Sequence, residues 1–175
     1  MNYIGNIFFS TATILKWKPL LQDDTYKNIL IQSLQTLTKL KRLMVFGFVI
    51  MPNHLHIIWA ENDNGNTYKE SAQAAFFKFT GHQFQKKMKR ENGEQLNKFL
   101  VNSADRKYQF WQRNTLDIEI FSERMFEQKL NYIHNNPLQK KWQLVDDPVK
   151  YRYSSASFYE KNIDEFGILT DYYLA

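Results

Sequence analysis

Two histidines, His54 and His56, stand one residue apart in the stretch MPNHLHIIWA. Side chains alternate across a β-strand, so both imidazoles would share one face of a strand that begins at His54. Two neutral imidazoles held side by side can chelate one divalent cation. A bare His-X-His pair is a weak signal, and two ordinary strand histidines with solvent or hydrogen-bond partners fit it as well. The spacing therefore gives a metal site as a hypothesis that needs a second group.

That second group lies in the stretch NYIHNNP, within and just after a helix predicted over residues 123–135. The apolar residues that should form the inward face of this helix are Phe126, Leu130 and Ile133. Tyr132 lies about 120° away from them, and Asn136 follows it by four residues, so the two can share one side. The alternative is an amphipathic tyrosine, with Asn136 as a helix cap before Pro137. The pattern places a phenol and a carboxamide together, off the core face.

Tyr132 supplies a reactive group that the histidines lack. A phenol is protonated at neutral pH and is a poor nucleophile without help. A divalent cation beside a phosphate polarises the phosphorus centre and helps to align it with an attacking oxygen. Tyrosine suits a reaction in which a covalent phospho-enzyme keeps the bond energy for later rejoining. His54, His56 and Tyr132 together predict metal-assisted phosphoryl transfer through a tyrosine.

The other candidate ligands are few, because the chain has four histidines in all. His82 is predicted to lie on a helix surface, and His134 sits beside the tyrosine with its role open. A small metallohydrolase that uses a metal-bound water would need one more carboxylate or histidine. By sequence, Glu61 and Asp63 are the carboxylates that could fold back to supply it.

Positive charge is concentrated in residues 78–113, which hold nine basic and three acidic residues in a chain of net charge +5. Aromatic rings are interleaved with these charges, and a polyanion-binding surface needs both, for phosphates and for bases. A solvated basic helix is the alternative. The candidates for nucleic-acid contact in this segment are Lys86, Lys87, Lys89, Arg90, Lys107, Trp111, Gln112 and Arg113.

The elements that must position these residues follow from the hydrophobic pattern. Runs rich in β-branched and aromatic residues predict strands over 7–15, 43–50, 54–60 and the region 107–120. Apolar spacings of three and four, with capping residues, predict helices over about 24–40, 68–90 and 123–135. The remaining segments are a turn at 61–66, a loop or short helix at 91–102 and an unassigned tail from residue 140.

This order of strands and helices is typical of a ferredoxin-like α+β sandwich. The fold would be an antiparallel sheet with helices packed on one face, which leaves the other face for a ligand. The histidines would then stand on the face away from the core, since Leu55, Ile57 and Trp59 make the better core-facing set.

Length and composition predict one intracellular domain. The chain has 175 residues and is 43% hydrophobic, which suits a single domain over 1–175. It contains no cysteine, which excludes disulfides and thiolate zinc sites and favours a cytoplasmic protein. No run of about 18 apolar residues predicts a membrane span, and the N-terminus lacks a signal-peptide pattern.

Four motifs, in order, resemble one enzyme family. MPNHLHIIW resembles the histidine–hydrophobic–histidine signature of the HUH superfamily of single-strand DNA nicking and joining enzymes. Three further motifs are FWQRN at 110–114, YIHNNP at 132–137 and YRYSS at 151–155. They resemble motifs of the single-tyrosine transposase branch, above all those of REP-associated tyrosine transposases. The resemblance spans almost the whole chain.

The resemblance implies a ferredoxin-like fold and a metal-dependent DNA strand transferase. His54 and His56 would bind Mg²⁺ or Mn²⁺, with Asn136 as a third ligand. Tyr132 would attack a scissile phosphate in single-stranded DNA, leaving a 5′-phosphotyrosine and a free 3′-OH. The alternative is a catalytically inactive hairpin-binding module on the same scaffold, although a decayed copy should have lost one of the histidines or the tyrosine.

The resemblance also implies a DNA hairpin next to the cleavage site as partner. The basic segment, residues 78–113, is the candidate contact for that hairpin because of its positive charge. Gln112 and Arg113 match the family's WQR motif and could touch phosphate, although a buried structural turn explains them equally. The chain could act as a monomer or as a homodimer with exchanged tyrosine helices, and the sequence leaves that choice open.

Overall fold

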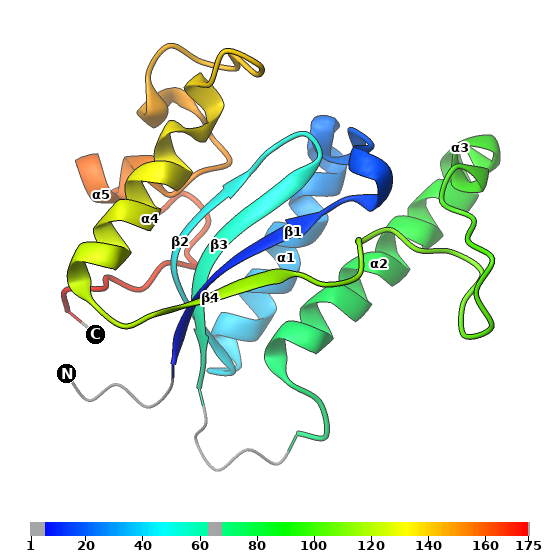
Figure 1. Cartoon of the computed structure of the whole chain (residues 1–175), viewed down its shortest axis with the longest axis horizontal. Coiled ribbons are helices and arrows are strands. Elements are labelled where there is room, and N and C mark those ends of the chain that lie inside the picture. Colours follow the sequence, from blue (N-terminus) through cyan, green and yellow to red (C-terminus); the bar gives the residue numbers. More distant parts are fainter. Residues whose placement is uncertain (1–5, 63–67, 175) are drawn as a thin grey trace.

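The computed structural model describes residues 6–62 and 68–174 and contains a four-stranded antiparallel sheet (Figure 1). The strand order is β2-β3-β1-β4, with every neighbouring pair antiparallel. The strands are β1 (Ile7–Thr13), β2 (Leu43–Ile50), β3 (His54–Glu61) and β4 (Leu116–Ile120). This order and the intervening helices confirm the predicted ferredoxin-like α+β fold.

Helices connect and cover these strands. The α-helices are α1 (Asp24–Lys39), α2 (Ala72–Glu91), α3 (Gly93–Asn97), α4 (Glu123–Asn135) and α5 (Ala156–Lys161). The short 3-10 helices are η1 (Leu15–Trp17), η2 (Leu20–Gln22), η3 (Asn136–Leu138) and η4 (Pro148–Lys150). Across residues 6–62 and 68–174, no helix is long and apolar enough to cross a membrane.

The main core lies between one sheet face and the pair α1 and α2. Leu55, Ile57 and Trp59 of β3 point into it, as their alternation predicts. Trp59 is fully buried, and its indole N–H donates to Ser10 Oγ at 2.8 Å, which satisfies the polar edge of a large apolar ring. The face that carries the histidines is therefore the opposite one.

Helix α4 crosses part of that opposite face, a placement that the sequence did not predict. Its apolar stripe packs against β2 and β3 in a second core, and Figure 1 shows α4 on the other side of the sheet from α1 and α2. The stripe is the predicted one, Phe126, Leu130 and Ile133, and all three side chains are buried. The face left for a ligand is therefore bounded by α4, which brings Tyr132 over the sheet.

The C-terminal segment covers the outer edge of β2. Ile50 N donates to Tyr153 O at 2.9 Å, and Tyr151 Oη donates to Ile50 O at 2.8 Å. Ser155 N donates to Phe48 O at 2.9 Å. The YRYSS motif thus caps a sheet edge, which would otherwise expose unpaired backbone groups.

Several predicted boundaries were wrong. Helix α2 begins at Ala72 rather than residue 68, because Ser71 caps it by accepting the Ala74 N–H. In the predicted strand region 107–120, only the last five residues form β4. The preceding residues form single bridges, Tyr108 to Leu100 and Trp111 to Ile14. Most of the predicted turn at 61–66 lies outside the described residues.

Gly47 permits α4 to approach the sheet closely. Gly47→Ala is therefore expected to destabilise the protein by about 1–3 kcal/mol, because the added methyl group overpacks the core. A Cβ at this position would lie 2.7 Å from Leu130 Cδ1 and 3.4 Å from Ser155 Oγ. Gly81→Ala is the matched control, because that helical glycine has no neighbouring atom within 4 Å of a built Cβ. It should stabilise by about 0.5–1 kcal/mol. Urea denaturation measures both, and equal stability of wild type and Gly47→Ala would contradict the close packing.

Candidate active site

His54 and His56 lie side by side on the sheet face that α4 bounds. Their ring centroids are 4.6 Å apart, and both side chains are buried. Strand β3 begins at His54, directly after the break at Met51-Pro52-Asn53. The two histidines share one face of this strand, which confirms the prediction. Phe9 of the neighbouring strand stacks on His56, with ring centroids 5.5 Å apart.

Hydrogen bonds fix the orientation of both rings. His54 Nδ1 donates to Asn53 Oδ1 at 2.7 Å, which leaves the lone pair of Nε2 free. His56 Nδ1 is 2.8 Å from Thr11 Oγ1, and Thr11 lies directly opposite His56 in the pairing of β1 with β3. In each histidine the Nδ1 atom is held by a partner, so Nε2 is the nitrogen available for a ligand.

The environment keeps both histidines neutral at pH 7. Burial lowers the pKa of His54 to about 4, with a smaller contribution from Lys141. Burial lowers the pKa of His56 to about 3, with contributions from His54, Lys141 and Lys129. A neutral imidazole is the form that binds a metal ion, so the pair is prepared for that role.

Tyr132 reaches the histidine pair from α4. Its hydroxyl is 3.5 Å from His56 Nε2, and the two ring centroids are 5.1 Å apart. Tyr132 is 45% exposed, so solvent reaches part of this residue. The structure therefore brings together the two groups that the sequence placed 76 residues apart.

Asn136 is only 1% exposed, which differs from its predicted position off the core face. It ends α4 and begins η3, where the chain turns into the protein at Pro137. Within the described residues its Oδ1 atom has no hydrogen-bond partner. A buried acceptor left without a partner costs about 1–3 kcal/mol, and a bound cation would remove that cost.

These donors fit a divalent cation. The Nε2 atoms of the two imidazoles and one amide oxygen are ligands that Mn²⁺ accepts, and Mg²⁺ prefers the oxygen. Among the residues with described structure, no three His, Cys, Asp or Glu side chains form a metal cluster. The role of Asn136 as a third ligand stays a prediction, which the buried Oδ1 atom without a partner among the described residues supports.

The remaining candidate ligands lie elsewhere. Glu61 is at the far end of β3 from His54, and its Oε1 atom accepts the Gln73 N–H at 2.9 Å. Asp63 lies outside the described residues. His134 Nε2 is 2.9 Å from Ser155 Oγ, and burial lowers the pKa of His134 to about 4. His134 thus ties α4 to the C-terminal segment and does not join the histidine pair.

Two lysines make the candidate site electropositive. Lys129 Nζ lies 4.8 Å from the centre of the Phe9 ring, which itself stacks on His56. Lys129 precedes Tyr132 by three residues, so both lie on one side of α4. Lys141 contributes to the lowered pKa of both histidines. Neither lysine forms an ion pair with another described residue, and such positive charge favours an anionic group beside the tyrosine.

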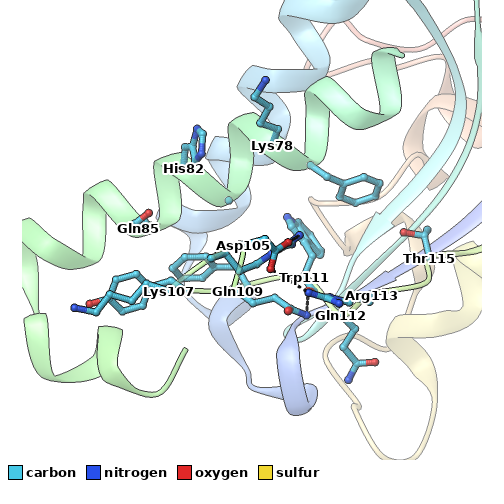
Figure 2. A pocket seen from close by; sticks show the side chains of 15 residues that line it. Lys78, His82, Gln85, Asp105, Lys107, Gln109, Trp111, Gln112, Arg113 and Thr115 are labelled. Atoms are coloured by element: carbon cyan, nitrogen blue, oxygen red, sulfur yellow. Dashed lines mark hydrogen bonds and ion pairs between the residues drawn. The ribbon is translucent and has the colours of Figure 1, made fainter. Parts of the chain in front are cut away.

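A basic pocket lies between α2 and the segment before β4, and its volume is about 540 Å³. Figure 2 shows its two walls, with Lys78, His82 and Gln85 on the α2 side. The predicted DNA-contact residues that line it are Lys107, Trp111, Gln112 and Arg113. The pocket therefore gathers charged and aromatic side chains from both ends of the basic segment.

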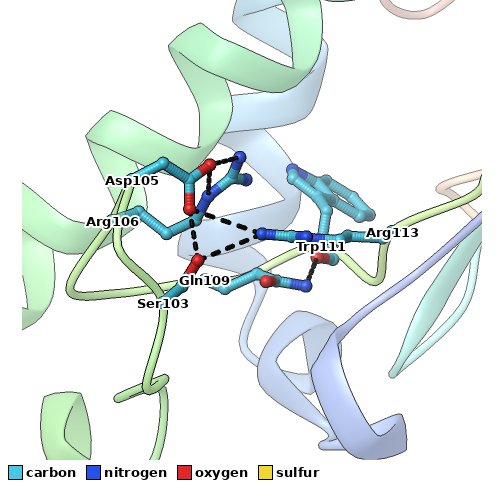
Figure 3. A network of polar contacts seen from close by, with 6 residues as sticks. All are labelled: Ser103, Asp105, Arg106, Gln109, Trp111 and Arg113. Carbon is cyan, nitrogen blue, oxygen red and sulfur yellow. Dashed lines mark hydrogen bonds and ion pairs between the residues drawn. The ribbon is translucent and has the colours of Figure 1, made fainter.

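An ion-pair network organises one wall of this pocket (Figure 3). Asp105 pairs with Arg106 at 2.5 Å and with Arg113 at 3.4 Å, and it also accepts from Ser103 Oγ. The hydrogen bonds from Arg106 and Ser103 hold the pKa of the Asp105 carboxyl well below its usual range. Arg113 is therefore positioned at the pocket and keeps three-fifths of its side chain exposed.

Trp111 forms a fixed wall of the pocket. Its indole N–H donates to Thr80 Oγ1 at 3.0 Å, and its ring packs at 5.4 Å from that of Phe77 and 5.9 Å from that of Phe84. Gln112 N donates to Thr13 O at 2.8 Å, so the segment is tied to the end of β1. The WQR stretch is thus both structural and pocket-lining.

The other predicted DNA-contact residues, Lys86, Lys87, Lys89 and Arg90, lie on the last turns of α2 outside the pocket. Lys87 pairs with Glu91 at 2.6 Å and lies over the Tyr26 ring, so its charge faces the protein. Arg90 pairs with the same glutamate at 2.7 Å. Lys86 and Lys89 are exposed. Their role in DNA contact stays a prediction.

Sequence reasoning missed the residues that hold the histidines. Thr11 is found only from the strand register, because nothing in its own sequence context sets it opposite His56. Asn53 directly precedes His54, and this adjacency could have predicted a hydrogen bond between the two side chains. Lys129 could have been found from its spacing of three residues before Tyr132.

The chain resembles a solved protein in its fold rather than in its sequence. No protein-family model and no curated protein matches the chain. A solved REP-associated tyrosine transposase bound to a REP hairpin is similar, with a TM-score of 0.61 and 16% identity over 98% of this chain and 90% of that chain. This similarity establishes the fold. A candidate transposase from Deinococcus radiodurans covers 77% of this chain and 94% of its own, at 15% identity and a TM-score of 0.41.

Proposed function

We propose that the protein is a metal-dependent single-strand DNA transposase of the HUH single-tyrosine type, acting next to a DNA hairpin. The observation that carries the proposal is the 3.5 Å approach of the Tyr132 hydroxyl to the His54–His56 pair. The four sequence motifs support it, as does the fold shared with a REP-associated tyrosine transposase whose structure holds a REP hairpin.

The reaction is a transesterification at phosphorus. The Tyr132 oxygen forms a bond to the scissile phosphorus while the bond to the 3′ oxygen breaks, which yields a 5′-phosphotyrosine and a free 3′-OH. The phenol proton passes to solvent water, which reaches the half-exposed side chain, and water returns a proton to the departing 3′ oxygen. Attack by a 3′-OH on the phosphotyrosine reverses these steps and joins strands, so no outside energy source is required.

The chain's own residues prepare this step. His54, His56 and the Asn136 oxygen, which has no partner among the described residues, would hold Mg²⁺ or Mn²⁺, which supplies charge neutralisation at the phosphate when bound. Lys129 and Lys141 add positive charge beside the same face. Because the histidines are neutral and oriented by Asn53 and Thr11, the donor atoms need little rearrangement.

The basic pocket supports binding of the DNA beside the cleavage site. It combines cations with aromatic rings, which is the chemistry that phosphates and bases require. His54, His56 and Tyr132 meet within one chain, so we infer that a monomer can bring these three side chains together. An enzyme of this kind acts on DNA in the cytoplasm.

Arg113→Gln is expected to weaken binding of hairpin DNA and to reduce the slope of log affinity against log salt by about one. The reason is the loss of one exposed cation at the pocket. Lys150→Gln is the matched control, since Lys150 is similarly exposed and similarly paired with an aspartate, but outside the pocket. Titrations at several salt concentrations measure both, and equal slopes for the two variants would remove Arg113 from the interface.

The proposed function is tested by incubating the protein with single-stranded hairpins from the flanks of its gene, with Mn²⁺ or Mg²⁺. The expected product is a protein–DNA adduct that survives a denaturing gel and disappears when a chelator is added. Cleavage without an adduct would point to a metallohydrolase that uses water. Tight hairpin binding with neither cleavage nor adduct would favour the inactive binding module.

A further inference from the structure

An exposed tryptophan stands beside the candidate metal site. Trp17 is 57% exposed, although an indole is the largest apolar side chain and is usually well buried. Its ring centroid is 6.2 Å from that of His54, in an edge-to-face arrangement. A large ring that faces solvent next to reactive residues is available to stack on a ligand.

The backbone at Trp17 is strained and firmly held. Lys16 and Trp17 have φ values of 55° and 56°, in the left-handed region that costs about 1–3 kcal/mol for each such residue. Two backbone hydrogen bonds hold the residues just before this turn. Ile14 N donates to Asn53 O at 2.9 Å, and Leu15 N donates to Phe110 O at 2.7 Å. Such strain persists only where the surroundings fix it, and it concentrates at functional sites.

One side chain connects this turn to the metal site. Asn53 Nδ2 donates to Trp17 O at 3.2 Å, while Asn53 Oδ1 accepts from His54 Nδ1 at 2.7 Å. The same carboxamide therefore orients the histidine and positions the tryptophan. Any ligand that binds at His54 would pass close to the indole.

The surroundings of Trp17 carry uncompensated positive charge. Burial, together with repulsion from Lys16 and Lys98, lowers the pKa of Lys18. Within the described ranges, none of these three lysines forms an ion pair. Lys18 Nζ lies 5.1 Å from the Phe99 ring, and Phe99 stacks on Phe110 at 4.6 Å, so the cluster continues toward the basic pocket. An exposed ring among free cations suits a single-stranded nucleic acid.

We propose that Trp17 is a stacking platform for a nucleobase next to the scissile phosphate, with Lys16, Lys18 and Lys98 binding the phosphates of the same strand. This inference rests on the proposed function, because it assumes that single-stranded DNA enters the site. It adds a base-binding position beside His54, whereas Tyr132 contacts the ring of His56, the other member of the pair. Stacking tolerates any base, so the platform would hold the strand without fixing its sequence.

The test compares two oligonucleotides of equal length, oligothymidylate and its abasic analogue, with a chelator present so that no chemistry occurs. Fluorescence anisotropy measures the affinity for each. Wild type is expected to prefer oligothymidylate, and Trp17→Ala should reduce that preference by about 5- to 150-fold without changing abasic affinity. Trp17→Phe should retain part of the preference. Phe121→Ala is the control, because Phe121 is an exposed ring at the opposite end of β1 and β4.

Each outcome decides the inference. An unchanged preference in Trp17→Ala would overturn it, and an equal loss of affinity for both oligonucleotides would show that Trp17 only supports the turn. Failure of wild type to bind either oligonucleotide would overturn both this inference and the proposed function. A Trp17-dependent preference in a protein that forms no covalent adduct would support the platform and reject the transposase.

Discussion

Tyr132→Phe is expected to abolish the covalent protein–DNA adduct, with a loss in rate of more than about a thousandfold. The phenylalanine keeps the ring contacts with His56 and Phe9 and removes only the oxygen that would bond to phosphorus. The variant should therefore fold and bind hairpin DNA as wild type does. A denaturing gel detects the adduct, and anisotropy measures the binding.

Tyr173→Phe is the matched control for this substitution. Tyr173 is half exposed, like Tyr132, and its hydroxyl bonds to Glu127 rather than to a histidine. This control should leave adduct formation unchanged. An adduct that persists in Tyr132→Phe would move the nucleophile to another residue, and the geometry at His56 would then have a different purpose.

The strand that carries the histidines was predictable because its pattern has a period of two. Leu55 and Trp59 are apolar and His54 and His56 are polar, so alternation alone assigned the faces. The helix that carries Tyr132 was predictable for a similar reason, since its apolar stripe has helical spacing. Local periodicity therefore predicted which face of β3 carries the histidines and which face of α4 is buried, and the order of the elements predicted the fold class.

The contacts between elements were not predictable in this way. The burial of Asn136 depends on how α4 lies across the sheet, and the pairing of Thr11 with His56 depends on strand register. Register is set by the whole sheet rather than by the residues in question. The strained turn at Trp17 carries no glycine, which is the usual signal of a positive φ. These features arise from tertiary packing that a single sequence pattern does not encode.

In the proposed function, the two faces of one sheet carry two tasks, cleavage on one face and hairpin binding on the other. The histidines and Tyr132 lie on the face bounded by α4, whereas Trp111 packs with Phe77 of α2 on the opposite side. The end of β1 joins them, because Thr13 lies opposite His54 and its carbonyl accepts the Gln112 N–H. A DNA partner held in the pocket could thus direct its single strand around this end of the sheet toward Tyr132.

His54→Gln and His56→Gln are each expected to lower the affinity for Mn²⁺ by more than about 100-fold, since loss of even an outer partner of a metal site costs about 10- to 100-fold. Mn²⁺ should raise the thermal stability of wild type, because a ligand that binds only the folded state stabilises it. The gain should vanish in both variants. Glutamine is used because it fills part of each buried space and can retain a polar contact.

The same titration separates Asn136 from the histidines. Asn136→Ala removes an acceptor that has no partner within the described residues, so the metal-free protein should lose little hydrogen-bond energy, while its Mn²⁺ affinity falls. His82→Gln is the control, since His82 is exposed on α2 and lines the pocket on the other face. Unchanged Mn²⁺ affinity in His56→Gln would exclude the histidine pair as the metal site. The Asn136 oxygen, unsatisfied within the described residues, would then need another partner, and the DNA phosphate cannot be that partner, because both groups only accept hydrogen bonds.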